Sequence, residues 1–324
     1  MPAKNAATYL VDCIDSVLNQ SFTNWELIII DDFSADNTVE IIQNYIKSDA
    51  RIKYLPNRVS GIIPALQLAF NNSSGLFITR MDADDLMPPD KLQVLINKLS
   101  KYNRSVVTGK VCYFSDQKLS EGYLRYETWL NSLIDKKEFF AAVYRECIIA
   151  SPNWLVSRSC FEKDFQFSDL SYPEDYDMVF QWYKSGYKII SVDAVTHLWR
   201  EHTARTSRHH EAYQQQAFFE LKTNYFIDLE IENNEKIQLF GAGLKGKLVA
   251  KTLIEKKVNF DWFDFNISEN SKNIFDKKVS SVFDSISGMK SIITVWPIDP
   301  NIQNEIQIFF NDREFIFGKN CWLF

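Results

Sequence analysis

Three carboxylates follow one another closely near residue 80. Asp82, Asp84 and Asp85 come after the apolar residues 76–79, whose composition is typical of a buried strand. Because carboxylates this close repel one another, we expect a positive charge to offset them. Mg²⁺ or Mn²⁺ carrying a phosphate group suits such a segment, since both ions prefer oxygen ligands. The segment alone leaves a solvated acidic turn open, while Leu86, at a ligand position of a calcium-binding EF-hand loop, argues against that motif.

A second acidic pair, Asp31 and Asp32, ends the continuous apolar run at residues 25–30. Such a run is typical of a parallel strand that is buried on both faces. Helical spacing of apolar residues predicts helices over 10–18, 38–46, 61–71 and 91–99, and strands are predicted over 52–55 and 105–114. This alternation predicts an α/β fold with a mostly parallel sheet. Both acidic clusters then lie at the carboxyl edge of the sheet, where ligands bind in such folds.

Composition limits the other classes of function. The 324 residues are 46% hydrophobic and carry a net charge of −6, which argues against a non-specific nucleic-acid binder. The five cysteines are scattered without a Cys-x-x-Cys pair, so neither a disulfide framework nor a zinc site is expected. No apolar run reaches the roughly 18 residues of a membrane span, and no signal peptide is visible. We expect a cytoplasmic protein.

Several motifs, taken in order, resemble glycosyltransferase family 2. They are Pro2-x-x-Asn5, Asn19-Gln20-Ser21-Phe22, the run from Glu26 to Thr38 that contains Asp31-Asp32, and Arg80-Met81-Asp82-Ala83-Asp84-Asp85. The resemblance implies the GT-A fold, a nucleotide-sugar-binding α/β domain, over residues 1–207. It also implies inverting transfer of a sugar from a nucleotide-sugar donor.

The resemblance assigns roles at the donor end of the site. By this match Asp32 contacts the uracil ring of a UDP-sugar. Asp84 binds Mn²⁺ or Mg²⁺, and Asp82 lies beside the ion or contacts ribose or sugar hydroxyls. The further residues expected to bind the nucleotide-sugar are Pro2, Ala3, Asn5, Asp31, Arg80 and Ala83.

The chain departs from the family pattern near its start. The family's first strand normally precedes Pro2, so we expect it to be missing or reduced to Met1. Lys4 stands where an aromatic residue is usual, and residues 64–67 replace an Arg-Asn pair often found after Gly61. Contacts to the diphosphate are therefore expected to differ, while the acidic residues are intact.

Two later segments carry the remaining candidate site residues. Glu174 and Asp175 follow Pro173, a pattern that is ordinary for a helix start. Glycosyl transfer also needs a carboxylate that takes the acceptor proton. The family match makes Asp175 the catalytic base, with Glu174 a supporting group or the alternative base. It also places His202 in the metal shell, and Arg200 or Arg205 beside the diphosphate. In the acceptor half, residues 121–150 are rich in aromatic side chains, and we assign no acceptor-binding residue there.

A different pattern occupies the end of the chain. Residues 208–234 are expected to form a helical linker, followed by a small Rossmann-like domain over 235–324. In that domain Gly241-Ala242-Gly243-Leu244-Lys245-Gly246 follows a predicted strand and precedes a helix, and Asp264 ends the next strand. The length fits only half of a dinucleotide-binding domain. Nucleotide binding and an interaction or regulatory role both remain open.

The sequence thus predicts a metal-dependent, inverting glycosyltransferase that uses a UDP-sugar. The expected acceptor is a hydroxyl of a glycan or lipid-linked glycan in surface polysaccharide synthesis. A lipid-linked acceptor would bring the protein to the inner face of the membrane, and the C-terminal domain is the candidate surface for a homo-oligomer. Two alternatives are a nucleotidyltransferase and a nucleotide-sugar-binding regulatory protein without turnover.

Overall fold

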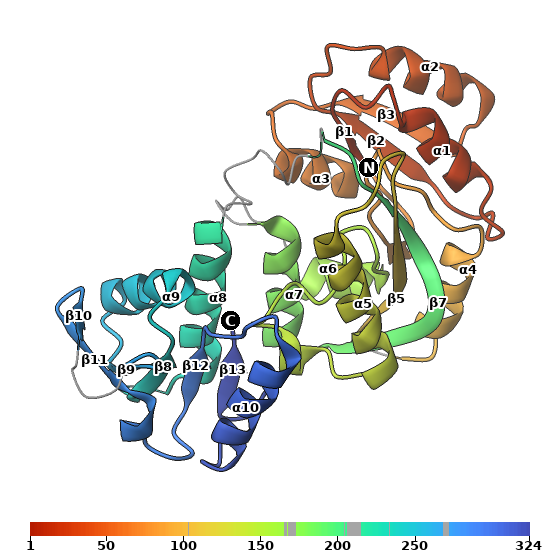
Figure 1. Cartoon of the computed structure of the whole chain (residues 1–324). Coiled ribbons are helices and arrows are strands. Elements are labelled where there is room, and N and C mark those ends of the chain that lie inside the picture. The colour runs from red at the N-terminus through yellow and green to blue at the C-terminus, as the bar shows by residue number, and fades with distance from the viewer. Residues whose placement is uncertain are drawn as a thin grey trace. The chain divides into compact units, whose positions relative to one another are not determined.

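The computed structural model describes residues 1–102, 104–164, 167, 173–203, 205, 215–232, 234–267 and 272–324. The chain divides into two compact units (Figure 1): unit 1 is Met1–Glu138 with Ile148–His209, and unit 2 is Phe139–Cys147 with His210–Phe324. The chain therefore passes from one unit to the other at three points in its sequence. The boundary predicted at 207/208 lies outside the described residues.

Unit 1 begins with a parallel sheet of the order β1-β2-β3. The strand β2 is buried at every position, as its run of branched apolar side chains predicts. A short first strand is present, because Pro2 pairs with Ile30 and Ala3 with Asp31. The elements of this part are β1 (Pro2–Ala3), α1 (Leu10–Leu18), β2 (Leu27–Asp31), α2 (Thr38–Ser48), β3 (Ile52–Pro56) and α3 (Ile62–Asn71).

The helix α1 shows why these segments pack as they do. Its buried side chains Leu10, Cys13, Ile14 and Val17 recur at helical spacing and join the core that β2 enters. Burying each such aliphatic side chain contributes about 1.5–3 kcal/mol. The predicted apolar face of this helix is confirmed, and α2 likewise begins at Thr38 as predicted.

The second half of unit 1 is built on the parallel pair of long strands β5 and β7, which lie side by side in Figure 1. Its register runs from Ser105 opposite Lys188 to Phe114 opposite Arg200, with an irregularity next to Gly109. The elements of this part are β4 (Phe77–Ile78), α4 (Lys91–Leu99), β5 (Ser105–Phe114), α5 (Glu121–Lys136), β6 (Val156–Ser157), α6 (Arg158–Asp164), α7 (Glu174–Lys184) and β7 (Lys188–Arg200).

The strand before the acidic residues differs from the prediction. β4 holds only Phe77 and Ile78, both partly exposed, and Leu76 before it is 79% exposed. β4 pairs antiparallel with β6, so it is not a buried strand of a parallel sheet. After Ile78 the ladder is not continued, and the hydroxyl of Thr79 donates to the carbonyl oxygen of Trp154. The chain then enters the segment Arg80–Asp85, which we call the acidic turn.

Unit 2 contains a sheet of the order β10-β11-β9-β8-β12-β13. Counted along the chain without β10, its strands follow the order 3-2-1-4-5, which matches five of the six strands of the Rossmann order 3-2-1-4-5-6, and each of these pairs is parallel. The helix α8 lies in unit 2, where the ring of Phe226 packs against Trp322. Its elements are η1 (Phe140–Ala142), α8 (Gln215–Glu230), β8 (Ile237–Phe240), α9 (Leu244–Glu255), β9 (Phe260–Asp264), β10 (Lys272–Ile274), β11 (Lys277–Ser281), η4 (Val282–Asp284), β12 (Ser291–Ile293), α10 (Pro300–Asn311) and β13 (Cys321–Leu323).

The segment Gly241–Gly246 of unit 2, which we call the glycine turn, depends on two of its glycines for steric reasons. Gly241 has a φ of +101°, which disfavours other residues. A Cβ at Gly246 would lie 1.9 Å from the carbonyl oxygen of Gly241, so any other residue at this position would force the backbone to shift. At Gly243 a Cβ would meet no atom within 4 Å. The turn therefore brings α9 close to β8.

Among the helices of the described residues, we find none with the length and apolar character that a membrane crossing requires.

Candidate active site

The acidic turn is the centre of the candidate site, and each of its carboxylates has a different partner. Asp82 Oδ1 accepts from Arg80 Nε at 2.7 Å. Asp84 Oδ2 lies 2.9 Å from His202 Nε2, and Asp85 Oδ2 lies 3.0 Å from His197 Nε2. The mutual repulsion expected from the sequence is thus reduced, because the negative charge is spread over partners from separate segments.

Asp84 and His202 form the part of the site that suits a divalent ion. Their side chains are only 28% and 14% exposed, and the His202 ring packs on that of Tyr9 with centroids 4.5 Å apart. Burial would raise the pKa of Asp84, but the hydrogen bond with His202 and the charge of Arg205 outweigh it and lower that pKa. Asp84 therefore presents an ionised carboxylate beside an imidazole.

One carboxylate oxygen and one imidazole nitrogen fit Mn²⁺ or Mg²⁺ whose other ligands are phosphate oxygens and water. The described residues hold no group of three or more His, Cys, Asp or Glu side chains arranged around a common ion position. Asp82 is turned to Arg80 through Oδ1. The donor set that the protein offers is therefore Asp84 with His202, and Asp82 lies next to it in the turn.

Asp32, the residue expected from the family resemblance to contact the nucleotide base, is almost fully buried. Its carboxylate is 5% exposed and accepts from Asn57 Nδ2 at 2.7 Å, from the Gly61 N–H at 2.9 Å and from Lys4 Nζ at 3.1 Å. Burial would raise the pKa of Asp32, but these donors outweigh it and lower the pKa. Lys4, which replaces an aromatic residue of the family pattern, thus forms an ion pair with Asp32.

The segment around β1 lies against the same edge. Pro2 and Ala3 pair with β2, and the carbonyl of Ala3 accepts from the N–H of Asp32 at 2.7 Å. Asn5 has a φ of +49°, and its side-chain oxygen accepts from the N–H of Ala35 at 2.8 Å. The sequence-predicted residues Pro2, Ala3, Asn5, Asp31 and Asp32 are therefore brought together, and Asp31 itself is buried and accepts from the N–H of Ser34.

Arg80 connects the acidic turn to the start of α7. Its guanidinium donates through Nε to Asp82 and through Nη1 to Glu174 Oε1, both at 2.7 Å. The side chains of Arg80 and Glu174 are each only 4% exposed, and Ala83 is buried beside them in the turn. Removing one partner of such a buried pair leaves an uncompensated charge, so the pair fixes where α7 begins relative to the turn.

Asp175 occupies the first turn of α7, next to Glu174. It is partly buried, and burial together with the negative charge of Glu174 raises the pKa of Asp175 to about 7. A carboxylate with a pKa near neutrality accepts a proton far better than an ordinary aspartate does. Asp175 therefore has the electrostatic setting of a general base, and Glu174 is engaged by Arg80.

Arg200, the last residue of β7, is bound to the chain itself. Arg200 donates through Nε to the carbonyl of Asp84 and through Nη2 to Asp12. Its guanidinium lies over the rings of Tyr9 and Phe114, at 4.8 and 4.6 Å from their centroids. In the described geometry Arg200 therefore holds the acidic turn rather than pointing away from it.

Arg205 pairs with Glu201 at 3.2 Å and lies over the ring of Trp199 at 5.0 Å. The carboxylates of Asp84 and Asp85 raise its pKa despite its burial, so it stays cationic. Arg205 thus supplies a fixed positive charge near the acidic turn.

Sequence reasoning missed several partners of these residues. Tyr9, Asp12 and His197 were not singled out, although each contacts a residue of the site or of the acidic turn. His197 is wholly buried and lies 112 positions from Asp85 in the sequence. No local motif announces a pair separated by such a distance, so only the folded chain identifies it.

Comparison with known proteins agrees with this architecture. The sequence profile named "Glycosyl transferase family 2" matches residues 1–165. A Haemophilus influenzae protein called "Uncharacterized glycosyltransferase" is 24% identical over 317 residues, which cover 87% of this chain and 96% of that protein. "Glycosyltransferase GlyA" of Streptococcus pneumoniae is 28% identical over 148 residues, 44% of this chain and 21% of that protein. The chain thus spans about a fifth of GlyA.

Solved structures show the same fold. The Staphylococcus aureus TarS fragment 1–349 in complex with UDP-GlcNAc has a TM-score of 0.54 at 16% identity, covering 78% of this chain and 70% of that chain. This chain is mixed α/β with parallel strands, and its likeness to this structure confirms the predicted GT-A fold. With the profile matching half of its length, the chain belongs to glycosyl transferase family 2.

Proposed function

We propose that the chain transfers a sugar from a UDP-sugar to a hydroxyl of a glycan or lipid-linked glycan. The observation that carries the proposal is the convergence of three groups at the acidic turn: Asp84 with His202, the Arg80–Glu174 pair, and Asp175 with its raised pKa. A divalent ion and diphosphate would lie beside Asp84 and His202, and the attacking hydroxyl would approach Asp175. The family profile, which matches residues 1–165 and so includes the acidic turn, supports a glycosyl transfer at this place.

The donor assignment draws on named relatives. TarS binds UDP-GlcNAc and UDP in its solved complexes. WfgD of Escherichia coli, 39% identical over 110 residues that cover 34% of this chain and 43% of that protein, is named as a glucosyltransferase that uses UDP-Glc and a diphosphoundecaprenol-linked GlcNAc. We therefore propose a UDP-sugar donor and surface polysaccharide synthesis. A lipid-linked acceptor would bring the chain to the membrane surface.

Binding of the donor would begin at the buried edge of the β1-β2-β3 sheet. Asp32 is ionised and would accept from the imide N–H of uracil, with Asp31 and the β1 segment forming the wall beside it. Lys4 pairs with Asp32 through a side chain that is 53% exposed, so it can move aside or donate to a base carbonyl. Asp82, which is less buried than Arg80, would meet ribose or sugar hydroxyls.

Asp84 and His202 would hold Mn²⁺ or Mg²⁺, which as a Lewis acid stabilises negative charge on the diphosphate. The Mn²⁺ complex of the Pyrobaculum calidifontis mannosyltransferase PcManGT, which has a TM-score of 0.50 at 16% identity and covers 78% of this chain and 68% of that chain, supports such an ion in this fold. Arg205 adds a permanent positive charge near the same turn. These groups would make the diphosphate a better leaving group.

Asp175 would take the proton of the acceptor hydroxyl while the hydroxyl oxygen forms a bond to the anomeric carbon. The bond from that carbon to the diphosphate oxygen breaks on the opposite face, which inverts the configuration. Positive charge develops on the sugar ring in such a transition state. Glu174, paired with Arg80, would keep α7 and hence Asp175 at a fixed position relative to the acidic turn.

The test is thermal stabilisation by UDP, GDP, CDP and dTDP, each with Mn²⁺ and with a chelator. A ligand that binds the folded state raises the melting temperature by mass action. We expect stabilisation by UDP that depends on Mn²⁺, followed by release of UDP when a UDP-sugar and an acceptor are supplied. Stabilisation by GDP alone would mean that the donor is a GDP-sugar instead of a UDP-sugar. Release of pyrophosphate would mean that the reaction is nucleotidyl transfer instead of sugar transfer. No stabilisation by any nucleotide would contradict the proposal.

A further inference from the structure

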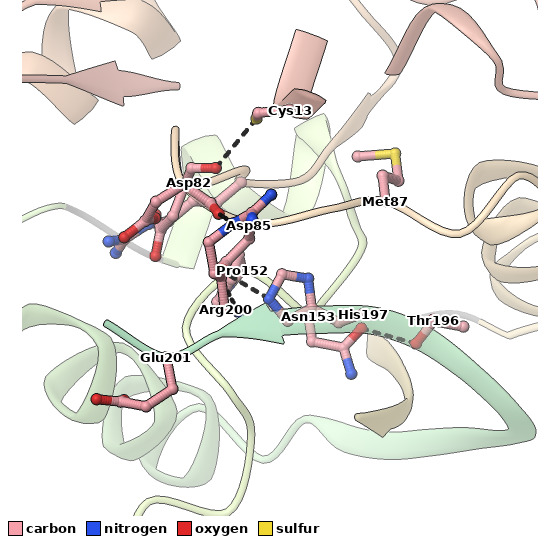
Figure 2. A network of polar contacts seen from close by, with 12 residues as sticks. Cys13, Asp82, Asp85, Met87, Pro152, Asn153, Thr196, His197, Arg200 and Glu201 are labelled. Carbon is pink, nitrogen blue, oxygen red and sulfur yellow. Dashed lines mark hydrogen bonds and ion pairs between the residues drawn. The ribbon is translucent and has the colours of Figure 1, made fainter. Parts of the chain in front are cut away.

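Asp85 is the most buried carboxylate of the acidic turn, and both of its oxygens are used. Its side chain is 1% exposed. Oδ1 accepts from the backbone N–H of Arg200 at 2.8 Å, and Oδ2 lies 3.0 Å from His197 Nε2, whose side chain is wholly buried. Figure 2 shows Asp85 beside Arg200 and His197 of β7. Asp85 thus ties two segments that are 112–115 positions apart in the sequence.

Further hydrogen bonds fasten the same two segments. The N–H of Leu86 donates to the carbonyl of Leu198 at 3.0 Å, and the N–H of Leu198 donates to the carbonyl of Leu86 at 3.1 Å. The Nε of Arg200 donates to the carbonyl of Asp84 at 2.8 Å. Positions 84, 85 and 86 are therefore each bonded to the end of β7.

This fastening controls the pair proposed to hold the divalent ion. Asp84 directly precedes Asp85, and His202 follows Arg200 by two residues. Their side chains lie within 2.9 Å of each other, directly beside the place where the turn and the strand end are joined. Groups that orient metal ligands typically change metal affinity by 10–100-fold when they are removed.

We propose that Asp85, acting with His197, is a positioning residue that sets the geometry of Asp84 and His202 for a divalent ion. The inference rests on the proposed function, since it concerns the ion site of that function. The inference goes beyond that function because it gives Asp85, the third carboxylate of the turn, a role in which it contacts neither the ion nor the donor. A buried carboxylate that only stabilised the fold would make the same contacts, so the test must separate affinity for the ion from stability.

The experiment measures Mn²⁺ binding to the full chain with UDP present, from the loss of the electron paramagnetic resonance signal of free Mn²⁺. Asp85→Ala removes both acceptors, and we expect the apparent Mn²⁺ affinity to fall by about 10–100-fold. Asp85→Asn keeps one acceptor for the N–H of Arg200 and can donate to His197, so it should recover most of that loss. His197→Ala removes the contact between Asp85 and His197 from the side of His197. If Asp85→Ala does not fold, the Mn²⁺ affinity of His197→Ala tests the inference instead.

Thr196→Val is the matched control. Thr196 lies on β7 next to His197, is buried, and donates to Asn153 Oδ1 at 2.7 Å without reaching the acidic turn (Figure 2). Its loss should lower the melting temperature and leave the Mn²⁺ affinity within twofold of the parent.

Three outcomes overturn the inference. The first is a parent-like Mn²⁺ affinity in folded Asp85→Ala or in His197→Ala. The second is equal weakening in Asp85→Ala and Asp85→Asn, which would mean that charge alone matters. The third is weakening in Thr196→Val that matches the weakening in Asp85→Ala. A parent chain that binds no Mn²⁺ with UDP would overturn the proposed function itself, so the two failures are distinguishable.

Discussion

The acidic turn of unit 1 and the glycine turn of unit 2 both follow a strand, yet they are held in different ways. Arg80, Asp84 and Asp85 bond to side chains 94, 118 and 112 positions later. In the glycine turn, Asp264 accepts from the N–H of Ala242 only 22 positions away. The first turn therefore depends on the folding of the whole unit, and the second depends on its own backbone and the next strand.

The contrast indicates that the acidic turn should determine binding and rate, whereas the glycine turn should determine the stability of unit 2. The contacts of the acidic turn are charged, partly buried and shared with the residues proposed to bind the donor, so changes there should alter binding and rate. The contacts of the glycine turn are steric, because Gly246 leaves no room for a Cβ beside Gly241. Changes there should alter the stability of unit 2. The following variants test that division.

The largest effect is expected for Asp175→Asn. An amide cannot accept the acceptor proton, so the transfer rate should fall by about 10²–10⁴-fold. The affinity for UDP with Mn²⁺ should stay within twofold of the parent, because Asp175 is not proposed to contact the nucleotide. Rates measured with a UDP-sugar and UDP titration calorimetry check both parts. An unchanged rate would contradict the assignment of the base.

Asp84→Ala should remove the Mn²⁺ dependence of UDP binding. Loss of a hydrogen-bond partner of a metal ligand typically lowers metal affinity by 10–100-fold, and loss of the ligand itself should lower the Mn²⁺ affinity by at least as much. The measurement is UDP affinity with Mn²⁺ and with a chelator, and the two values should become equal. Asp12→Asn is a useful comparison, because Asp12 contacts only the guanidinium of Arg200 among these groups and is 61% exposed. UDP binding that keeps its Mn²⁺ dependence in Asp84→Ala would refute the metal assignment.

The rate should also depend on pH in a defined direction. Burial and the charge of Glu174 raise the pKa of Asp175 to about 7, and only its ionised form can accept a proton. The value of kcat/KM should therefore fall about tenfold per unit as the pH drops below about 7. In Glu174→Gln the neighbouring negative charge is absent, so the pKa of Asp175 should fall and the acid limb should move to lower pH. A limb that stays in place would show that Glu174 does not set the pKa.

The smallest effect on the reaction is expected in the glycine turn. Gly246→Ala places a Cβ 1.9 Å from the carbonyl oxygen of Gly241 and should destabilise unit 2 by about 1–3 kcal/mol. Gly243→Ala, where a Cβ meets no atom within 4 Å, should cost less than about 1 kcal/mol. Chemical unfolding checks the stability of both variants. Loss of Mn²⁺-dependent UDP binding in folded Gly246→Ala would contradict the division between the two units.

The local elements of the fold were predictable from the sequence. The strand β5 (Ser105–Phe114) and the helix α4 (Lys91–Leu99) have the predicted bounds, because each is long enough to show its own apolar period. The strand β4 was predicted wrongly as a buried strand. It is short and partly exposed, since its pairing is decided by β6, nearly 80 positions later. A strand that forms only because it pairs with a distant segment cannot be recognised from the pattern of its own residues.

The candidate site divides in the same way. The types and spacing of Asp82 and Asp84 indicated a site for a metal ion and phosphate, and the family resemblance indicated the base role of Asp175; these roles stay predictions. What the sequence could not indicate is which charges neutralise one another. The binding of Arg200 to Asp12 and to the carbonyl of Asp84 depends on side-chain directions in the folded unit. A basic residue near an acidic motif is compatible with either a ligand contact or a structural one.

The segment Phe139–Cys147 belongs to unit 2, although unit 1 lies on both sides of it in the sequence. Tyr144 is 1% exposed there, with its ring stacked on Phe324 and its hydroxyl donating to Glu230. A truncation before α8 would therefore leave nine residues of the remaining chain without the core they pack in. Unit 2 therefore cannot be removed by a single cut in the chain without separating this segment from its core. A chimaera that exchanges residues 210–324 would have to carry this internal segment with it.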